Sequence, residues 1–159
     1  MATVEVDKAS LQANFERNER GLRLRFARIG AILAIVLVPA GGLLDYLIYP
    51  QDWGLFLQIR LVCVLVIVLI ASLLYSSVAE RFGAMLAALL GITPSLAICG
   101  IIYLADGVAS SYYAGLMLIM IAVTQLLQSL WEALFVSLLI VGSYVVACLM
   151  HPVDDASTA

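Results

Sequence analysis

The apolar residues of this chain gather into long runs that short polar stretches separate. The runs cover residues 26–48, 56–76, 82–104, 112–127 and 131–150, and apolar and polar positions do not alternate within them. A run of about 18 or more apolar residues is long enough to cross a bilayer as a helix. Lipid cannot hydrogen-bond a backbone, so only helices or closed barrels span it, and barrel strands would alternate. The pattern predicts an all-α integral membrane protein with a bundle of about five transmembrane helices.

Polar segments flank this bundle at both ends. Residues 1–25 form a basic lead-in, in which we expect residues 1–10 to be disordered and the stretch from residue 11 to residue 28 to be a charged helix. Residues 151–159 form a polar, acidic tail. The basic residues before the first apolar run are Arg17, Arg20, Arg23, Arg25 and Arg28.

Basic residues flanking a span favour the cytoplasmic side of the membrane. The lead-in therefore predicts a cytoplasmic N-terminus and, for a bacterial protein, a multi-pass location in the inner membrane. Five crossings would then place residues 49–55, residues 105–111 and the C-terminus outside.

Composition strengthens the membrane interpretation. The chain is 64% hydrophobic and 12% charged, whereas soluble domains carry about 25% charged residues. One helical bundle accounts for the whole length and leaves no soluble domain. The basic residues form a membrane-orientation pattern and not a basic face on a soluble module, so we expect a lipid bilayer as partner and no nucleic acid.

The sequence carries no recognisable catalytic motif. It contains no His-Glu-x-x-His, no Gly-x-Ser-x-Gly and no P-loop. Its three cysteines lie inside apolar runs without a Cys-x-x-Cys spacing, and its single histidine has no second ligand nearby. We expect no catalytic residue, no metal site and no cofactor.

Two charged residues lie at the ends of apolar runs near the predicted outer surface. Asp45 comes near the end of the first run and Arg60 near the start of the second. Charges at membrane depth need a partner or water. Three interpretations remain open: each side chain reaches to the headgroups, the two form an ion pair that clamps the hairpin, or one contacts a ligand.

Aromatic residues concentrate at the same predicted depth. In one interpretation these residues form an interfacial belt. In the other they line a cup, together with one or two carboxylates, that holds a small amphipathic ligand. The candidate residues of this outer mouth are Asp45, Tyr46, Tyr49, Arg60, Asp106, Tyr112 and Tyr113.

The third run contains a face of small residues. Gly83, Ala87 and Gly91 recur every four residues, so they align along one side of a helix, where small side chains let another helix approach closely. Pro39 and Pro94 lie inside apolar runs, and we expect a kink at each.

Four short motifs follow one another within residues 17–150. They are Arg23-Leu-Arg25-Phe-Ala-Arg28-Ile29, then Leu44-Asp45-Tyr46 with Tyr49-Pro50, then Phe56-Leu-Gln-Ile-Arg60, and finally Ser111-Tyr112-Tyr113-Ala114-Gly115-Leu116. In this order they resemble the N-terminal multi-helix membrane sensor module of bacterial histidine kinases and nucleotide cyclases. The resemblance implies a receptor or anchor that feeds a cytoplasmic effector, usually as a dimer.

The resemblance also implies six helices, whereas the apolar runs number five. The chain is then either a fragment of a longer protein or a stand-alone relative. The leading hypothesis is a sensory module of a signal-transduction protein, as a homodimer or in a larger membrane complex. The alternative is a structural or accessory subunit of such a complex. A small transporter or channel ranks last because few polar residues lie inside the runs.

Overall fold

The structure, a computed structural model, consists of helices throughout its described part. It describes residues 2–105, 110, 112–124 and 130–150, with the side chains at 2–10, 13, 16, 17, 113, 123 and 124 left out. The helices are α1 (Ala2–Ile48), α2 (Trp53–Leu74), α3 (Val78–Leu104), α4 (Tyr113–Thr124) and α5 (Leu130–Met150). The prediction of an all-α fold with five helices is confirmed.

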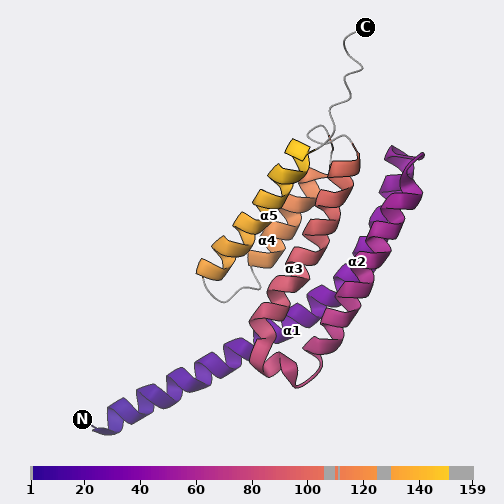
Figure 1. The fold of residues 1–159 in the computed structure, drawn as a ribbon. Coiled ribbons are helices and arrows are strands. Elements are labelled where there is room, and N and C mark those ends of the chain that lie inside the picture. Colours follow the sequence, from indigo (N-terminus) through magenta and orange to yellow (C-terminus); the bar gives the residue numbers. More distant parts are fainter. Residues whose placement is uncertain (1, 106–109, 111, 125–129, 151–159) are drawn as a thin grey trace.

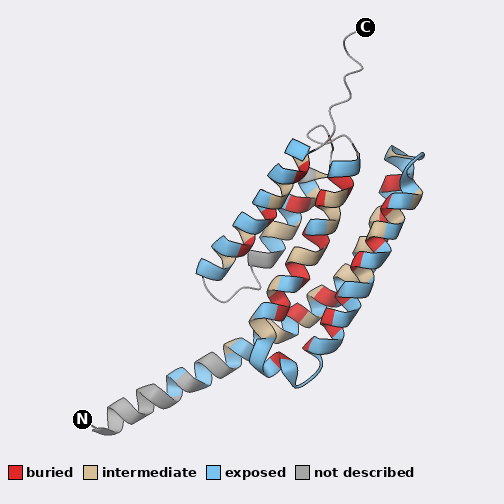
Figure 2. Ribbon diagram, viewed as in Figure 1, coloured by how far each residue is buried: buried red, intermediate tan, exposed pale blue. Residues whose placement is uncertain are grey.

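Four of these helices are long and apolar enough to cross a membrane. They are α2, α3, α5 and the part of α1 from Asn18 to Ile48. Figure 2 shows pale blue, exposed residues along the outer sides of the helices, and many of them are large apolar side chains such as Leu65 and Leu138, which are 65% and 75% exposed. Water would disfavour such a surface and lipid does not, so the chain is a multi-pass membrane protein.

The helix α4 falls short of a full crossing in its described length. Its 12 residues rise about 18 Å, against about 30 Å for the hydrocarbon core. The predicted fourth run extends to residue 127, and residues 125–127 lie outside the described part. The orientation of the bundle in the membrane, with a cytoplasmic N-terminus, stays a prediction.

The helix α3 lies at the centre of the arrangement. It contacts each of the other four helices, with the antiparallel α1–α2 hairpin on one side and α4 and α5 on the other (Figure 1). The first half of α3 joins a core with α1 and α2 that includes Ala31, Ile67 and Leu90. Its second half joins a core with α4 and α5 that includes Ile102 and Ile140.

The small-residue face of α3 lies against α1 and α2 of the same chain. A Cβ atom at Gly83 would lie 2.8 Å from Leu24 Cδ2 of α1. Ala87 is 4% exposed and belongs to the core shared with α1 and α2, and Gly91 is buried. These small residues therefore serve contacts within the chain.

One local expectation is wrong, and α3 has a break that the sequence did not predict. The expected disordered start is helical from Ala2 onward, which is consistent with the many good helix formers in the lead-in. The residue of α3 with non-helical dihedral angles is Phe82, at φ −119° and ψ 17°, and not Pro94. The break separates the first turn of α3, which follows the turn after α2, from the apolar segment that enters the core.

Candidate functional site

A buried ion pair joins the end of α1 to the start of α2. Asp45 lies in the last turn of α1 and Arg60 in the early turns of α2, and the antiparallel hairpin brings them together. Arg60 donates from Nε to Asp45 Oδ2 at 2.6 Å and from Nη2 to Asp45 Oδ1 at 2.8 Å. Asp45 is 0% exposed and Arg60 is 8% exposed. Of the three interpretations of these charges, the structure contains the ion pair. Its geometry is the bidentate one that arginine and carboxylate favour.

A glycine of α1 leaves the space that the guanidinium fills. A Cβ atom at Gly41 would lie 2.5 Å from Arg60 Nη1 and 2.8 Å from Arg60 Cζ, so any larger residue would displace the arginine. Arg60 Nη1 donates to the backbone carbonyl of Val38 at 3.2 Å. The last three turns of α1 thus supply both the anion and the cradle for the cation.

The residue before α4 completes the set of donors around the carboxylate. The hydroxyl of Tyr112 donates to Asp45 Oδ1, and the Arg60 Cζ atom lies 5.9 Å from the centroid of the Tyr112 ring. The backbone N–H of Tyr112 donates to Ser110 Oγ at 3.4 Å, and Ser110 is 2% exposed. Asp45, Arg60 and Tyr112, which we term the polar latch, therefore hold three segments of the chain together.

Aromatic rings surround the polar latch on one side. The ring of Tyr49 stacks on that of Tyr112 with centroids 6.0 Å apart and planes at 24°. Tyr49 also meets Phe56 edge-on at 5.7 Å, and Phe56 is fully buried. A buried charge pair is stronger when water is kept away, and these rings exclude water from it.

Tyr46 occupies a different position from the other predicted residues. It meets Trp53 edge-on at 5.8 Å, and its side chain is 57% exposed. This pair faces outward, where amphipathic rings suit the headgroup region. The structure thus leaves Tyr46 on the surface and gathers Asp45, Tyr49, Arg60 and Tyr112 into one cluster. Asp106 and the side chain of Tyr113 lie outside the described residues.

Sequence reasoning missed the contributions of Gly41, Val38, Phe56 and Ser110. A signal existed for Gly41, which precedes Asp45 by four residues and therefore lies on the same face of α1. The neighbouring Pro39 predicts only a kink in this part of the run. The Val38 contact uses a backbone carbonyl, and no residue type marks such a contact in a sequence.

The fold and the buried polar latch at one end define a helical, multi-pass membrane module. The family model of the MASE8 domain matches residues 43–156, which is more than half of the chain and contains Asp45, Arg60 and Tyr112. The chain belongs to the MASE8 family of membrane-associated sensor domains, which are non-catalytic modules. The resemblance to a membrane sensor module is confirmed. No curated protein and no solved structure matches this chain.

Proposed function

We propose that this MASE8 domain is the sensory and anchoring module of a bacterial signal-transduction protein in the inner membrane. The observation that supports this function is the polar latch, in which one carboxylate joins α1, α2 and the start of α4. Membership of a sensor family favours this role over that of an accessory subunit. The proposed input is a small amphipathic ligand that reaches the latch from the aromatic end of the bundle.

The latch suits a switch because Arg60 and Tyr112 bind Asp45 through different numbers of hydrogen bonds. Arg60 holds Asp45 through two hydrogen bonds, whereas Tyr112 holds it through one. A ligand whose polar group replaces the Tyr112 hydroxyl would free the start of α4 and leave the ion pair intact. A hydrogen bond to a charged group contributes about 1.5–3 kcal/mol, which corresponds to a shift of about 10- to 150-fold between two arrangements. A ligand shifts this equilibrium only if its affinity differs between the two arrangements.

Helix α1 provides a route from the latch to the other end of the bundle. It carries Asp45 near its C-terminal end and comprises 47 residues, which corresponds to about 70 Å. Near its middle, 21 residues before Asp45, it packs on α3 through Leu24 and Gly83. A change at the latch would therefore alter how α1 and α3 meet at the predicted cytoplasmic side. We propose that a homodimer or larger complex passes this change to an effector such as a histidine kinase or nucleotide cyclase.

Ligand binding in lipid nanodiscs tests the proposal. The probes are medium-chain fatty acids, alkyl amines and short-chain quinones, and the readout is the thermal unfolding midpoint of the full chain. A probe that replaces the Tyr112 hydroxyl at Asp45 should raise the midpoint of Tyr112→Phe more than that of the wild-type protein, because the variant lacks the hydroxyl with which the probe competes. Tyr75→Phe is the matched control, because Tyr75 is an exposed tyrosine near Arg28 at the opposite end. Equal shifts in all three proteins would rule out the latch as the ligand site.

The link to an effector has its own test. The intact mass of the native protein, taken from its own membranes, is compared with the 17.1 kDa of this chain. A much larger mass, with a soluble domain in the same reading frame, supports an input module fused to its effector. A mass near 17.1 kDa would contradict the fused arrangement and favour the accessory-subunit alternative.

A further inference from the structure

Two adjoining pockets lie at the end of the bundle opposite the polar latch. The first has a volume of about 270 Å³ and lies between α1 and the start of α3. The second has a volume of about 460 Å³ and lies between α3 and α5. Both are lined by Arg81 and Ala84, so they meet at the start of α3. Neither takes part in the latch.

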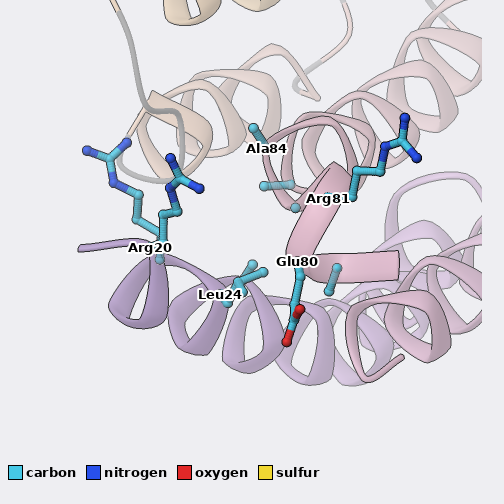
Figure 3. A pocket seen from close by; sticks show the side chains of 10 residues that line it. Arg20, Leu24, Glu80, Arg81 and Ala84 are labelled. Atoms are coloured by element: carbon cyan, nitrogen blue, oxygen red, sulfur yellow. The ribbon is translucent and has the colours of Figure 1, made fainter. Parts of the chain in front are cut away.

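The first pocket is rich in positive charge. Its charged lining residues are Arg20, Arg23, Arg81 and Glu80, three cations against one anion. In the view of Figure 3, the side chain of Glu80 extends away from the guanidinium groups of Arg20 and Arg81. In the same view Arg20 and Arg81 extend on opposite sides, so positive groups flank the pocket.

One nitrogen of an arginine in this pocket has no hydrogen-bond acceptor among the described residues. It is Arg23 Nη1, which is buried. The other terminal nitrogen, Nη2, lies 3.5 Å from Glu19 Oε2, an exposed contact between residues one turn apart. A buried donor without an acceptor is costly, more so when it carries charge. An oxygen-bearing anion in the pocket would satisfy this donor.

The second pocket is an apolar groove that begins beside these arginines. Its lining includes Met85, Leu89 and Ile92 of α3 and Phe135 and Val136 of α5, together with the charged side chains of Arg81 and Glu132. The lining runs along α3 from residue 81 to residue 92, a rise of about 17 Å. One leaflet contributes half of the hydrocarbon core, or about 15 Å. The groove therefore has the depth of a single acyl chain below its headgroup.

We propose that the two pockets bind one anionic phospholipid, with its phosphate in the first pocket and one acyl chain in the second. The phosphate oxygens would accept from Arg23 Nη1 and neutralise Arg20 and Arg81, and the chain would cover the groove between α3 and α5. The apolar groove selects a lipid over free phosphate. The excess of arginine selects a net negative headgroup over a zwitterionic one.

The proposed site also fits the predicted orientation. The arginine-rich lead-in points to the cytoplasmic side, and the cytoplasmic leaflet is the one enriched in anionic lipid. Because the bound lipid would contact α1, α3 and α5, it would hold these helices in one arrangement at that end. The lipid site and the polar latch use separate residues, so either can be absent without the other.

Lipid retention measured by native mass spectrometry tests the site. The full chain is placed in nanodiscs of equal parts phosphatidylglycerol and phosphatidylcholine, and the lipids that stay bound on release are counted. The wild-type protein should retain phosphatidylglycerol in preference to phosphatidylcholine. Arg23→Gln should lower that retention about tenfold, the effect of losing one charge-assisted hydrogen bond. The matched control is Arg25→Gln, an exposed arginine on the same helix that lines neither pocket.

A second variant separates lipid binding from simple charge attraction. Ala88→Phe fills part of the groove without altering any charge, and it should lower retention of the lipid while the helical circular dichroism is unchanged. Added inorganic phosphate should not displace the lipid. The proposal is overturned if the wild-type protein shows no preference, if Arg25→Gln loses as much as Arg23→Gln, or if Ala88→Phe retains the lipid fully. Displacement by phosphate alone would show an anion site without a lipid.

Discussion

Replacing Asp45 by asparagine should destabilise the folded bundle strongly. The change removes the negative partner of Arg60, which is 8% exposed and is therefore poorly solvated by water. It also places amide hydrogens next to the guanidinium N–H groups, which in the wild-type protein donate to the carboxylate at 2.6 Å and 2.8 Å. Breaking a buried ion pair from one side costs about 3–5 kcal/mol. We expect Asp45→Asn to lose about 3 kcal/mol or more.

The loss of stability in Asp45→Asn should come from the uncompensated charge of Arg60. A double-mutant cycle measures this contribution. Arg60→Met removes the charge and keeps much of the side-chain volume, so the double variant should regain most of the stability lost by Asp45→Asn. The free energy of unfolding is measured in mixed micelles by titration with sodium dodecyl sulfate and followed by circular dichroism. Asp52→Asn, the same change at an exposed position beside α2, should alter the free energy of unfolding by about 0.5 kcal/mol or less.

A small effect would refute this reasoning. If Asp45→Asn costs less than about 1 kcal/mol, the pair has the energy of a solvated surface contact. If the costs of Asp45→Asn and Arg60→Met simply add, the two residues are not energetically coupled. Either outcome would remove the basis for treating the latch as the element that joins α1 to α2.

Three further predictions concern the same end of the bundle and the topology. Gly41→Ala should cost about 1–3 kcal/mol because its Cβ would displace the Arg60 guanidinium, whereas Gly100→Ala, with nothing within 4 Å of its Cβ, should cost none in the same titration. Tyr112→Phe keeps the stacked ring and loses its hydrogen bond to Asp45, so we expect a loss of about 1.5–3 kcal/mol. Reporter fusions should be active in the cytoplasm at the N-terminus and outside when inserted after Gln51, and the reverse pattern would contradict the predicted orientation.

The helices could be predicted because the membrane imposes them. Every long apolar run had to satisfy its own backbone groups, and each one contains a helix of the structure. The prolines were less informative. Pro94 lies inside α3 without non-helical dihedral angles, and the break lies at Phe82. A proline removes one hydrogen bond of a helix, but its neighbours decide whether the helix bends, and those neighbours belong to other segments.

The site could be predicted only in part. Asp45 and Arg60 are 15 residues apart in the chain, on either side of one turn, so a pair between them was one of three open interpretations. Tyr112 is 67 residues from Asp45, and the sequence suggested only a similar depth. The cradle at Gly41 and the unpaired Arg23 Nη1 follow from side-chain positions, and no pattern of residue types carries that information.

The sequence by itself determined that this protein lies in lipid, that its segments are helical and where along those segments its charges lie. Lipid enforces these features on each segment separately, because a backbone in hydrocarbon must bond to itself and a charge must stay near an interface or a partner. The tertiary structure alone decided which faces meet. Lipid tails are as apolar as leucine, so hydrophobicity does not select the neighbour of a membrane helix. Close packing at Gly41 and Gly83 and the hydrogen bonds around Asp45 make that choice, and they exist only once the helices have assembled.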